Sequence, residues 1–163
     1  MTLTCRPAKR ADAELLWRWA NDPETRRQSF TKATIPYEAH CAWLDARLGS
    51  PTCTILIFGD GGVPVGYARF DLVGDMAEIS IAVAPEQRGR GYGRAMLAAA
   101  LDRHREQRGA RVRTRASVLA ENKRSLRMFR ASGFRDVDEM NSPSGERVIV
   151  LEWARASAPA ARE

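Results

Sequence analysis

The chain has 163 residues, of which 44% are hydrophobic and 28% charged, and this composition is typical of a folded globular protein. Its formal net charge of +6 comes from arginines that are interspersed with acidic residues. This pattern argues against nucleic-acid binding and leaves two explanations open, a phosphate-rich ligand and a proteome that uses arginine in place of lysine. No apolar run approaches the roughly 20 residues of a membrane span. The first residues lack the apolar core of a secretory signal, so we expect a cytoplasmic protein.

The N-terminal half predicts helices after one short strand. Weak alternation indicates the strand, and Asp12 is a suitable N-cap for the first helix. Pro36 suits the start of a later helix, whose apolar stripe would consist of Tyr37, Cys41, Leu44 and Leu48. In chain order we expect a strand at 2–6, a helix at 12–20, a short second helix that follows the break at 21–23 and ends at 27, and a helix at 36–48.

The next residues predict strands joined by tight turns, and then two strand–helix units. The strands are expected at 52–58, 63–71, 76–83 and 111–118, the helices at 91–108 and 122–132, and a closing hairpin at 135–139 and 147–153. This order predicts a mixed α/β sheet with helices on both faces. We expect residues 1–153 to form one domain and residues 154–163, rich in Ala and Pro, to form a flexible tail.

The three cysteines do not indicate a disulfide framework or a metal site. Cys5, Cys41 and Cys53 are odd in number and widely spaced. Such a pattern is typical of free thiols in or near a core. We therefore expect no metal ion.

A glycine-rich loop, Arg88-Gly89-Arg90-Gly91-Tyr92-Gly93, joins a predicted strand to a helix that continues through Arg94. The first amides of a helix have no internal partner, and the helix dipole is positive there, so such a loop can bind an anion. Glycines let the backbone approach a pyrophosphate closely, and the arginines add positive charge. A simple strand-to-helix turn is the alternative. The dinucleotide-binding and P-loop patterns are both absent.

Two stretches resemble the GNAT superfamily of N-acetyltransferases. Residues 81–97 resemble its coenzyme A signature, Arg/Gln-x-x-Gly-x-Gly/Ala, with Arg88, Gly91 and Gly93 at the defined positions. Residues 120–134 resemble its Asn-to-Gly-Phe block, one strand–helix unit later. The resemblance implies a GNAT-type, mostly antiparallel sheet of six to seven strands and acetyl-CoA as cosubstrate.

The resemblance also implies a cofactor site. In the family, the strand before the loop pairs its backbone with the pantetheine arm, and the loop amides hold the pyrophosphate. Carried onto this sequence, the cofactor site consists of Ile81, Ala82, Val83, Arg88, Gly89, Arg90, Gly91, Tyr92, Gly93, Arg94, Asn122 and Ser125. A simple helix N-cap is an equally open explanation for Asn122, and the two roles can coexist.

Glu78 is the candidate catalytic residue. Strand alternation places Glu78 on one face together with Ser80 and Ala82. Several members of the family use a glutamate on this strand as general base, because an amine must be neutral to attack a thioester. A structural ion pair, for example with Arg69 on the preceding strand, is the alternative.

One position departs from the family. Many relatives have a tyrosine where this chain has Phe129, and phenylalanine cannot protonate the departing thiolate. The remaining alternatives are protonation by water, Ser125 or Tyr92, and departure of the thiolate without protonation. Proximity alone supplies much of the catalysis for so reactive an electrophile.

The N-terminal half resembles one GNAT branch. Leu16-Trp17-Arg18-Trp19-Ala20-Asn21-Asp22 and His40-Cys41-Ala42-Trp43 resemble acetyltransferases of UDP-linked amino sugars in pseudaminic acid synthesis and, more loosely, ribosomal-protein N-terminal acetyltransferases. The implied substrate contacts are Arg26, His40 and Trp43, where aromatic rings and charge suit a nucleotide sugar. A core Trp43, a satisfied surface His40 and a surface ion pair of Arg26 are the alternatives.

Three functions therefore stay open. The first is a small-molecule N-acetyltransferase, with a nucleotide-linked amino sugar as the leading acceptor. The second is an acetyltransferase of protein N-termini, and the third is a non-catalytic module that senses acetyl-CoA. We expect a small-molecule amine as partner, no nucleic acid and no membrane. A homodimer is compatible with the sequence.

Overall fold

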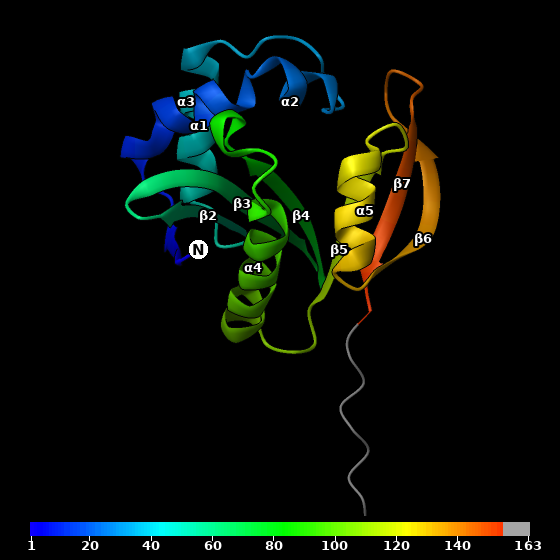
Figure 1. The fold of residues 1–163 in the computed structure, drawn as a ribbon. Helices are drawn as coiled ribbons and strands as arrows, with labels where there is room; N and C mark the ends of the chain where they lie inside the picture. Colours follow the sequence, from blue (N-terminus) through cyan, green and yellow to red (C-terminus); the bar gives the residue numbers. More distant parts are fainter. Residues whose placement is uncertain (155–163) are drawn as a thin grey trace, which may run out of the picture.

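A seven-stranded sheet with helices on both faces forms the centre of the molecule (Figure 1). The structure is a computed structural model that describes residues 1–154, so residues 155–163 of the expected tail lie outside the described part. The strand order is β1-β2-β3-β4-β5-β7-β6. All neighbours are antiparallel except β4 and β5, which are parallel. The predicted fold class is confirmed.

The elements follow the predicted order. The strands are β1 (Leu3–Pro7), β2 (Cys53–Asp60), β3 (Val63–Val73), β4 (Met76–Val83), β5 (Arg113–Leu119), β6 (Phe134–Asn141) and β7 (Arg147–Trp153). The helices are α1 (Ala13–Ala20), α2 (Pro23–Arg27), α3 (Tyr37–Leu48), α4 (Tyr92–Arg108) and α5 (Lys123–Ala131), with short 3-10 turns η1 (Arg10–Asp12) and η2 (Pro85–Gln87). No helix within residues 1–154 has the length and apolar character needed to cross a bilayer.

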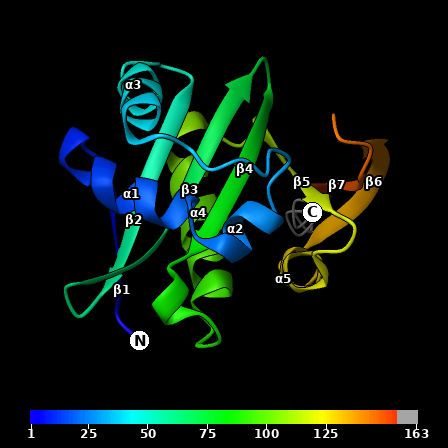
Figure 2. The ribbon, with the colours of Figure 1, turned by 90° about the horizontal axis from the view of Figure 1, so that it is seen from above.

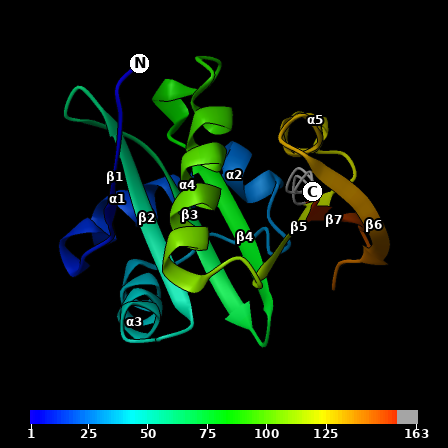
Figure 3. The ribbon, with the colours of Figure 1, turned by 90° about the horizontal axis from the view of Figure 1, so that it is seen from below.

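Two hydrophobic cores lie on opposite faces of the sheet. Because side chains of a strand alternate, Leu56 and Phe58 of β2 pack in the core with α4 and α5. Ile55 and Ile57 of the same strand pack in the other core with α1 and α3. Figures 2 and 3 show the two layers from opposite sides, with α1, α2 and α3 on one face and α4 and α5 on the other.

β4 and β5 separate within the sheet. They are paired only from Met76 to Glu78 on β4. β3 continues to pair along β4 as far as Val83, and β5 pairs with β7 as far as Leu119. Each strand therefore keeps its outer neighbour while the two diverge, as the view in Figure 2 shows. Beyond Glu78, no described strand pairs with the edge of β4 that faces β5.

Candidate active site

A cavity of about 810 Å³ lies where β4 and β5 diverge. One side consists of residues 79–83 of β4 and the other of residues 116–119 of β5. The glycine-rich loop, the start of α5 and residues near α2 complete it. Ligands of open α/β sheets bind at the carboxyl ends of parallel strands, and this cavity has that position. The predicted residues Ile81, Ala82 and Val83 all line it.

The glycines of the loop are required for different reasons. Gly89 and Gly91 have φ angles of 80° and 84°, in the left-handed region that side chains disfavour. Gly91 is the N-cap of α4 and has no side chain to bond the first amides of that helix. Gly93 is required by packing, because a Cβ there would lie 2.9 Å from the sulfur of Met128 on α5.

The cationic side chains near the glycine-rich loop are only partly those that the sequence predicted. Arg94 lines the cavity, as do Lys123 and Arg124 from the start of α5. Arg90 is absent from the lining and donates to Gln87 Oε1 at 3.1 Å. Arg88 lines the cavity but directs its guanidinium to Asp22. The sequence shows that the cations Lys123 and Arg124 directly follow Asn122. That they face the glycine-rich loop across the cleft follows only from the topology of the sheet.

Asn122 and Ser125 both line the cavity. The Asn122 side chain accepts a hydrogen bond from the Ser125 amide at 3.1 Å and so caps α5. The N-cap role proposed as an alternative is therefore present. A cofactor contact by the Asn122 side chain remains a prediction.

Glu78 lines the cavity at the point where the two strands separate. Its carboxylate forms an ion pair with Arg115, whose Nε lies 3.0 Å from Oε2. The ion pair expected between Glu78 and Arg69 is wrong, because Arg69 donates to Asp71 at 2.8 Å instead. The parallel register explains the correction, because it places Arg115 beside Glu78. The carboxylate remains partly exposed to the cavity.

The candidates for thiolate protonation are reduced by the structure. Phe129 is buried and also lines the cavity. The hydroxyl of Tyr92 donates to Asp60 Oδ2 at 2.7 Å. That bond raises the pKa of Tyr92 and lowers the pKa of Asp60. Tyr92 therefore has a structural partner at the end of β2, which leaves water, Ser125 and departure of the thiolate without protonation.

Comparison with known proteins decides the family. The model of the acetyltransferase (GNAT) family matches residues 13–134. This chain belongs to the GNAT family. The chain is also 31% identical over 109 residues to the L-amino acid N-acyltransferase MnaT of Escherichia coli K12. That match covers 62% of this chain and 60% of the relative, so the chain spans about three-fifths of the relative's length.

Solved structures have the same fold. An acetyltransferase from Salmonella typhimurium, solved with acetyl-CoA, has a TM-score of 0.76 at 24% identity and covers 99% of this chain and 100% of its own. The spermidine N-acetyltransferase of Vibrio cholerae, solved with CoA and spermine, has a TM-score of 0.80 at 17% identity, covering 92% and 94%. At these identities the likeness establishes the GNAT fold alone.

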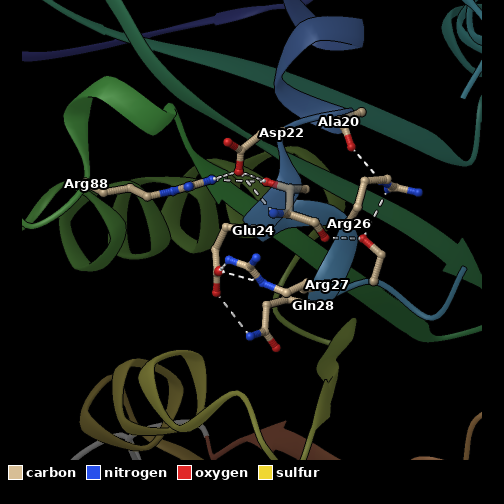
Figure 4. A network of polar contacts seen from close by, with 9 residues as sticks. Ala20, Asp22, Glu24, Arg26, Arg27, Gln28 and Arg88 are labelled. Carbon is tan, nitrogen blue, oxygen red and sulfur yellow. Dashed lines mark hydrogen bonds and ion pairs between the residues drawn. The ribbon is translucent and has the colours of Figure 1, made fainter. Parts of the chain in front are cut away.

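On the other side of the GNAT cleft, Arg26 lines the cavity but uses most of its donors within the chain (Figure 4). Its Nε donates to the carbonyl of Ala20 at 2.6 Å. Its terminal nitrogens contact the carbonyls of Thr31 and Ala33 and the hydroxyl of Ser29. Arg26 therefore fixes the segment that follows α2 and so shapes this part of the cleft.

His40 and Trp43 do not line the GNAT cleft. His40 is 4% exposed, and burial together with nearby Arg10 lowers its pKa. Trp43 lies beneath the guanidinium groups of Arg47 and Arg69, at 5.8 and 5.2 Å from the ring centre. The expected nucleotide-binding platform is not assembled at the cavity. Trp43 instead supports Arg69, which does line it.

Proposed function

We propose that this chain is an acetyl-CoA-dependent N-acetyltransferase acting on the primary amine of a small molecule. The observation that carries the proposal is the edge of β4 at residues 79–83, which pairs with no described strand and leads directly to the glycine-rich start of α4. Such an edge can pair with an amide-containing arm, and such a helix start can bind a pyrophosphate. Pantetheine and the diphosphate of coenzyme A have this order along one molecule. The GNAT assignment supports the proposal.

The donor set of the cavity suits the cofactor. The amides after Gly89 and Gly91 and the side chains of Arg94, Lys123 and Arg124 would hold the phosphates. Bound acetyl-CoA supplies a thioester, which a neutral amine can attack. Glu78, held by Arg115, would accept the proton of the amine at the point where the strands separate.

We propose an amino acid or a closely related amino carboxylate as acceptor. The relative MnaT supports this class. The cavity also contains Arg69, which lies in a cluster with Arg47 and Asp71. Two guanidinium groups share one carboxylate there, so the cluster keeps one positive charge for an acceptor carboxylate. Glu78 and Arg69 on adjacent strands thus suit the two ends of an amino acid.

A nucleotide-linked amino sugar is the second candidate, supported by the resemblance of the N-terminal half. It loses support because His40 and Trp43 lie outside the cavity. An N-terminal peptide is the third candidate. The three differ in the anion that accompanies the amine, and an acceptor screen separates them.

The test is thiol release from acetyl-CoA in the presence of matched amines, with the product identified by mass spectrometry. The panel contains L-amino acids, the corresponding amino acid amides, a UDP-linked amino sugar and a short peptide. We expect amino acids to react and their amides to react more slowly, because the amides lack the carboxylate. Thiol release only with the sugar or the peptide would reject the amino acid. No release with any amine, together with binding of acetyl-CoA, would favour the sensing module.

A further inference from the structure

Arg88 begins the glycine-rich loop, yet its side chain contacts α2 on the other side of the cleft (Figure 4). Its terminal nitrogen lies 2.6 Å from Asp22 Oδ2 and 3.1 Å from the hydroxyl of Thr25. The contact joins residues 66 positions apart in the chain. Both partners of the ion pair are largely shielded, with side-chain exposures of 25% for Arg88 and 15% for Asp22. Shielding makes a charge-assisted bond of this kind stronger than a surface ion pair.

Asp22 is also the N-cap of α2. The same oxygen accepts hydrogen bonds from the amide and the hydroxyl of Thr25, at 3.0 and 3.2 Å. Burial raises the pKa of Asp22, but the hydrogen bonds from Arg88 and Thr25 outweigh it, and the pKa is lowered. The carboxylate therefore stays charged, and one oxygen serves both the helix cap and Arg88.

The two elements that meet at this oxygen have different tasks in the proposed reaction. Arg88 directly precedes Gly89, whose left-handed φ angle sets the path of the loop amides. Thr25 lines the cavity beside Gln28, Ser29 and Phe30 of the segment after α2. A shift of the loop by a bound anion would therefore be transmitted to the acceptor side through one contact.

We propose that Arg88 is a positioning residue that ties the cofactor loop to α2, and that its side chain is not a phosphate ligand. The tie couples occupation of the loop to the placement of the acceptor side. This inference rests on the proposed function for its kinetic consequences. The Arg88–Asp22 contact itself is independent of it.

The test is a double-mutant cycle of Asp22→Asn and Arg88→Gln. Asparagine caps a helix about as well as aspartate, so the first change keeps the cap and removes the negative charge from the oxygen that Arg88 contacts. We expect each single variant to raise KM for the acceptor by about tenfold, the loss of one charge-assisted hydrogen bond. The double variant should be no worse than the more affected single variant, because both remove the same interaction. Arg88→Lys should recover part of the loss.

The matched control is Arg27→Gln, which removes an exposed pair with Glu24 within the same helix and leaves Arg88 in place. We expect little change from it. Calorimetry with CoA is the measurement that can contradict the proposal. If Arg88→Gln weakens CoA binding strongly while Asp22→Asn preserves or tightens it, Arg88 is a phosphate ligand and the proposal fails. Additive losses in the cycle would also overturn it.

Hydrogen exchange tests the Arg88–Asp22 contact without measuring acetyl transfer, so its result does not depend on the proposed function. Both single variants should speed amide exchange equally in residues 24–28, and CoA should slow exchange there in the wild type but not in the variants. A wild type that transfers no acetyl group would reject the proposed function, while the exchange result would still decide the tie. Unchanged exchange in both variants would overturn the tie.

Discussion

At the scale of single residues, Glu78 combines a cavity position with a fixed geometry. It is the last residue of β4 that pairs with β5, so its side chain lies where the proposed thioester and amine would meet. Arg115 bonds one carboxylate oxygen, Oε2. An acceptor amine could approach the other oxygen without breaking that bond. The ion pair and the base are therefore compatible roles.

We expect Glu78→Gln to lower kcat/KM by about 10²-fold at neutral pH, a typical loss for a general base. Raising the pH should recover activity, because the amine is then neutral without assistance. Arg115→Gln keeps the carboxylate and is the matched control, with a smaller expected loss. Rate profiles of both variants against pH provide the measurement. Equal losses in both variants, without recovery at high pH, would assign Glu78 a structural role alone.

His104 is a second residue with a distinct electrostatic state. It is 3% exposed, stacks on Phe70 with ring centres 4.1 Å apart, and has no hydrogen-bond partner on either ring nitrogen among the described residues. Burial, aided by nearby Arg108, lowers its pKa from 6.5 to about 4. The folded chain therefore holds the neutral ring, whereas the unfolded chain binds a proton below pH 6.5.

The stabilisation from neutral His104 is thus present above pH 6.5 and is lost as the pH falls towards 4. We expect His104→Phe, which keeps an aromatic ring on Phe70, to remove this part of the pH dependence. The difference corresponds to on the order of 3 kcal/mol in unfolding free energy. Urea unfolding at pH 7 and pH 4.5 measures it, and the carboxylates are common to both proteins. The same loss of stability in variant and wild type would contradict the assignment.

At the scale of elements, two glycines with the same backbone conformation distinguish the conformational cost of a substitution from its effect on cofactor binding. Gly91 and Gly145 have φ angles of 84° and 85°, and neither has an atom within 4 Å of its would-be Cβ. Only Gly91 lines the cavity; Gly145 lies in the turn between β6 and β7. The two positions therefore form a matched pair.

We expect Gly91→Ala and Gly145→Ala each to lower the unfolding free energy by about 1 kcal/mol, the cost of a left-handed alanine. Only Gly91→Ala should weaken binding of CoA, because only there does a Cβ face the proposed pyrophosphate. Calorimetry beside melting curves measures both effects. Intact CoA affinity in Gly91→Ala would remove the loop from the cofactor site.

The element order was predictable because local signals determine it. Glycine and proline end the elements, and alternation marks the strands. The buried face of α3 was predicted only in part, since Tyr37 and Leu48 of the expected stripe are 43% and 37% exposed. The buried residues of α3 are instead His40, Cys41 and Leu44, of which Cys41 and Leu44 pack in the core with α1 and β2. Such a choice of face depends on the neighbouring elements and not on the helix itself.

The residues of the site that are close in sequence were predictable, but the contacts between residues far apart in sequence were not. The cavity contains nearly all the residues expected from the GNAT motifs, because a strand, a loop and a helix start are contiguous. The partners of Arg88, Glu78 and Arg26 were not predictable, since a guanidinium bonds any suitable oxygen that the fold brings near. The 66-residue separation of Arg88 and Asp22 is one example.

At the scale of the whole molecule, the cleft lies between two parts of the sheet that are only partly joined. Three residue pairs connect β4 and β5. Helices α4 and α5 share one core beneath them, and Lys32 forms an ion pair with Glu146 at 3.1 Å between the segment after α2 and the β6–β7 turn. A ligand in the cavity would contact both parts at once.

We therefore expect acetyl-CoA to raise the stability of the whole fold and not of the loop alone. A ligand that binds only the native state adds about 2.7 kcal/mol at a hundredfold excess over its Kd. For a chain of this size that corresponds to a rise in Tm of about 5–10 °C.

The measurement is a thermal-shift titration followed by two probes, tryptophan fluorescence and circular dichroism. The fluorescence reports on both halves of the chain, through Trp17, Trp19 and Trp43 of the N-terminal half and Trp153 of β7. Both probes should shift together, since the ligand bridges the diverging strands. Gly91→Ala should reduce the shift and Gly145→Ala should preserve it. No shift at millimolar acetyl-CoA would reject the cofactor site, and a shift in one probe alone would show that the ligand does not stabilise the fold as one cooperative unit.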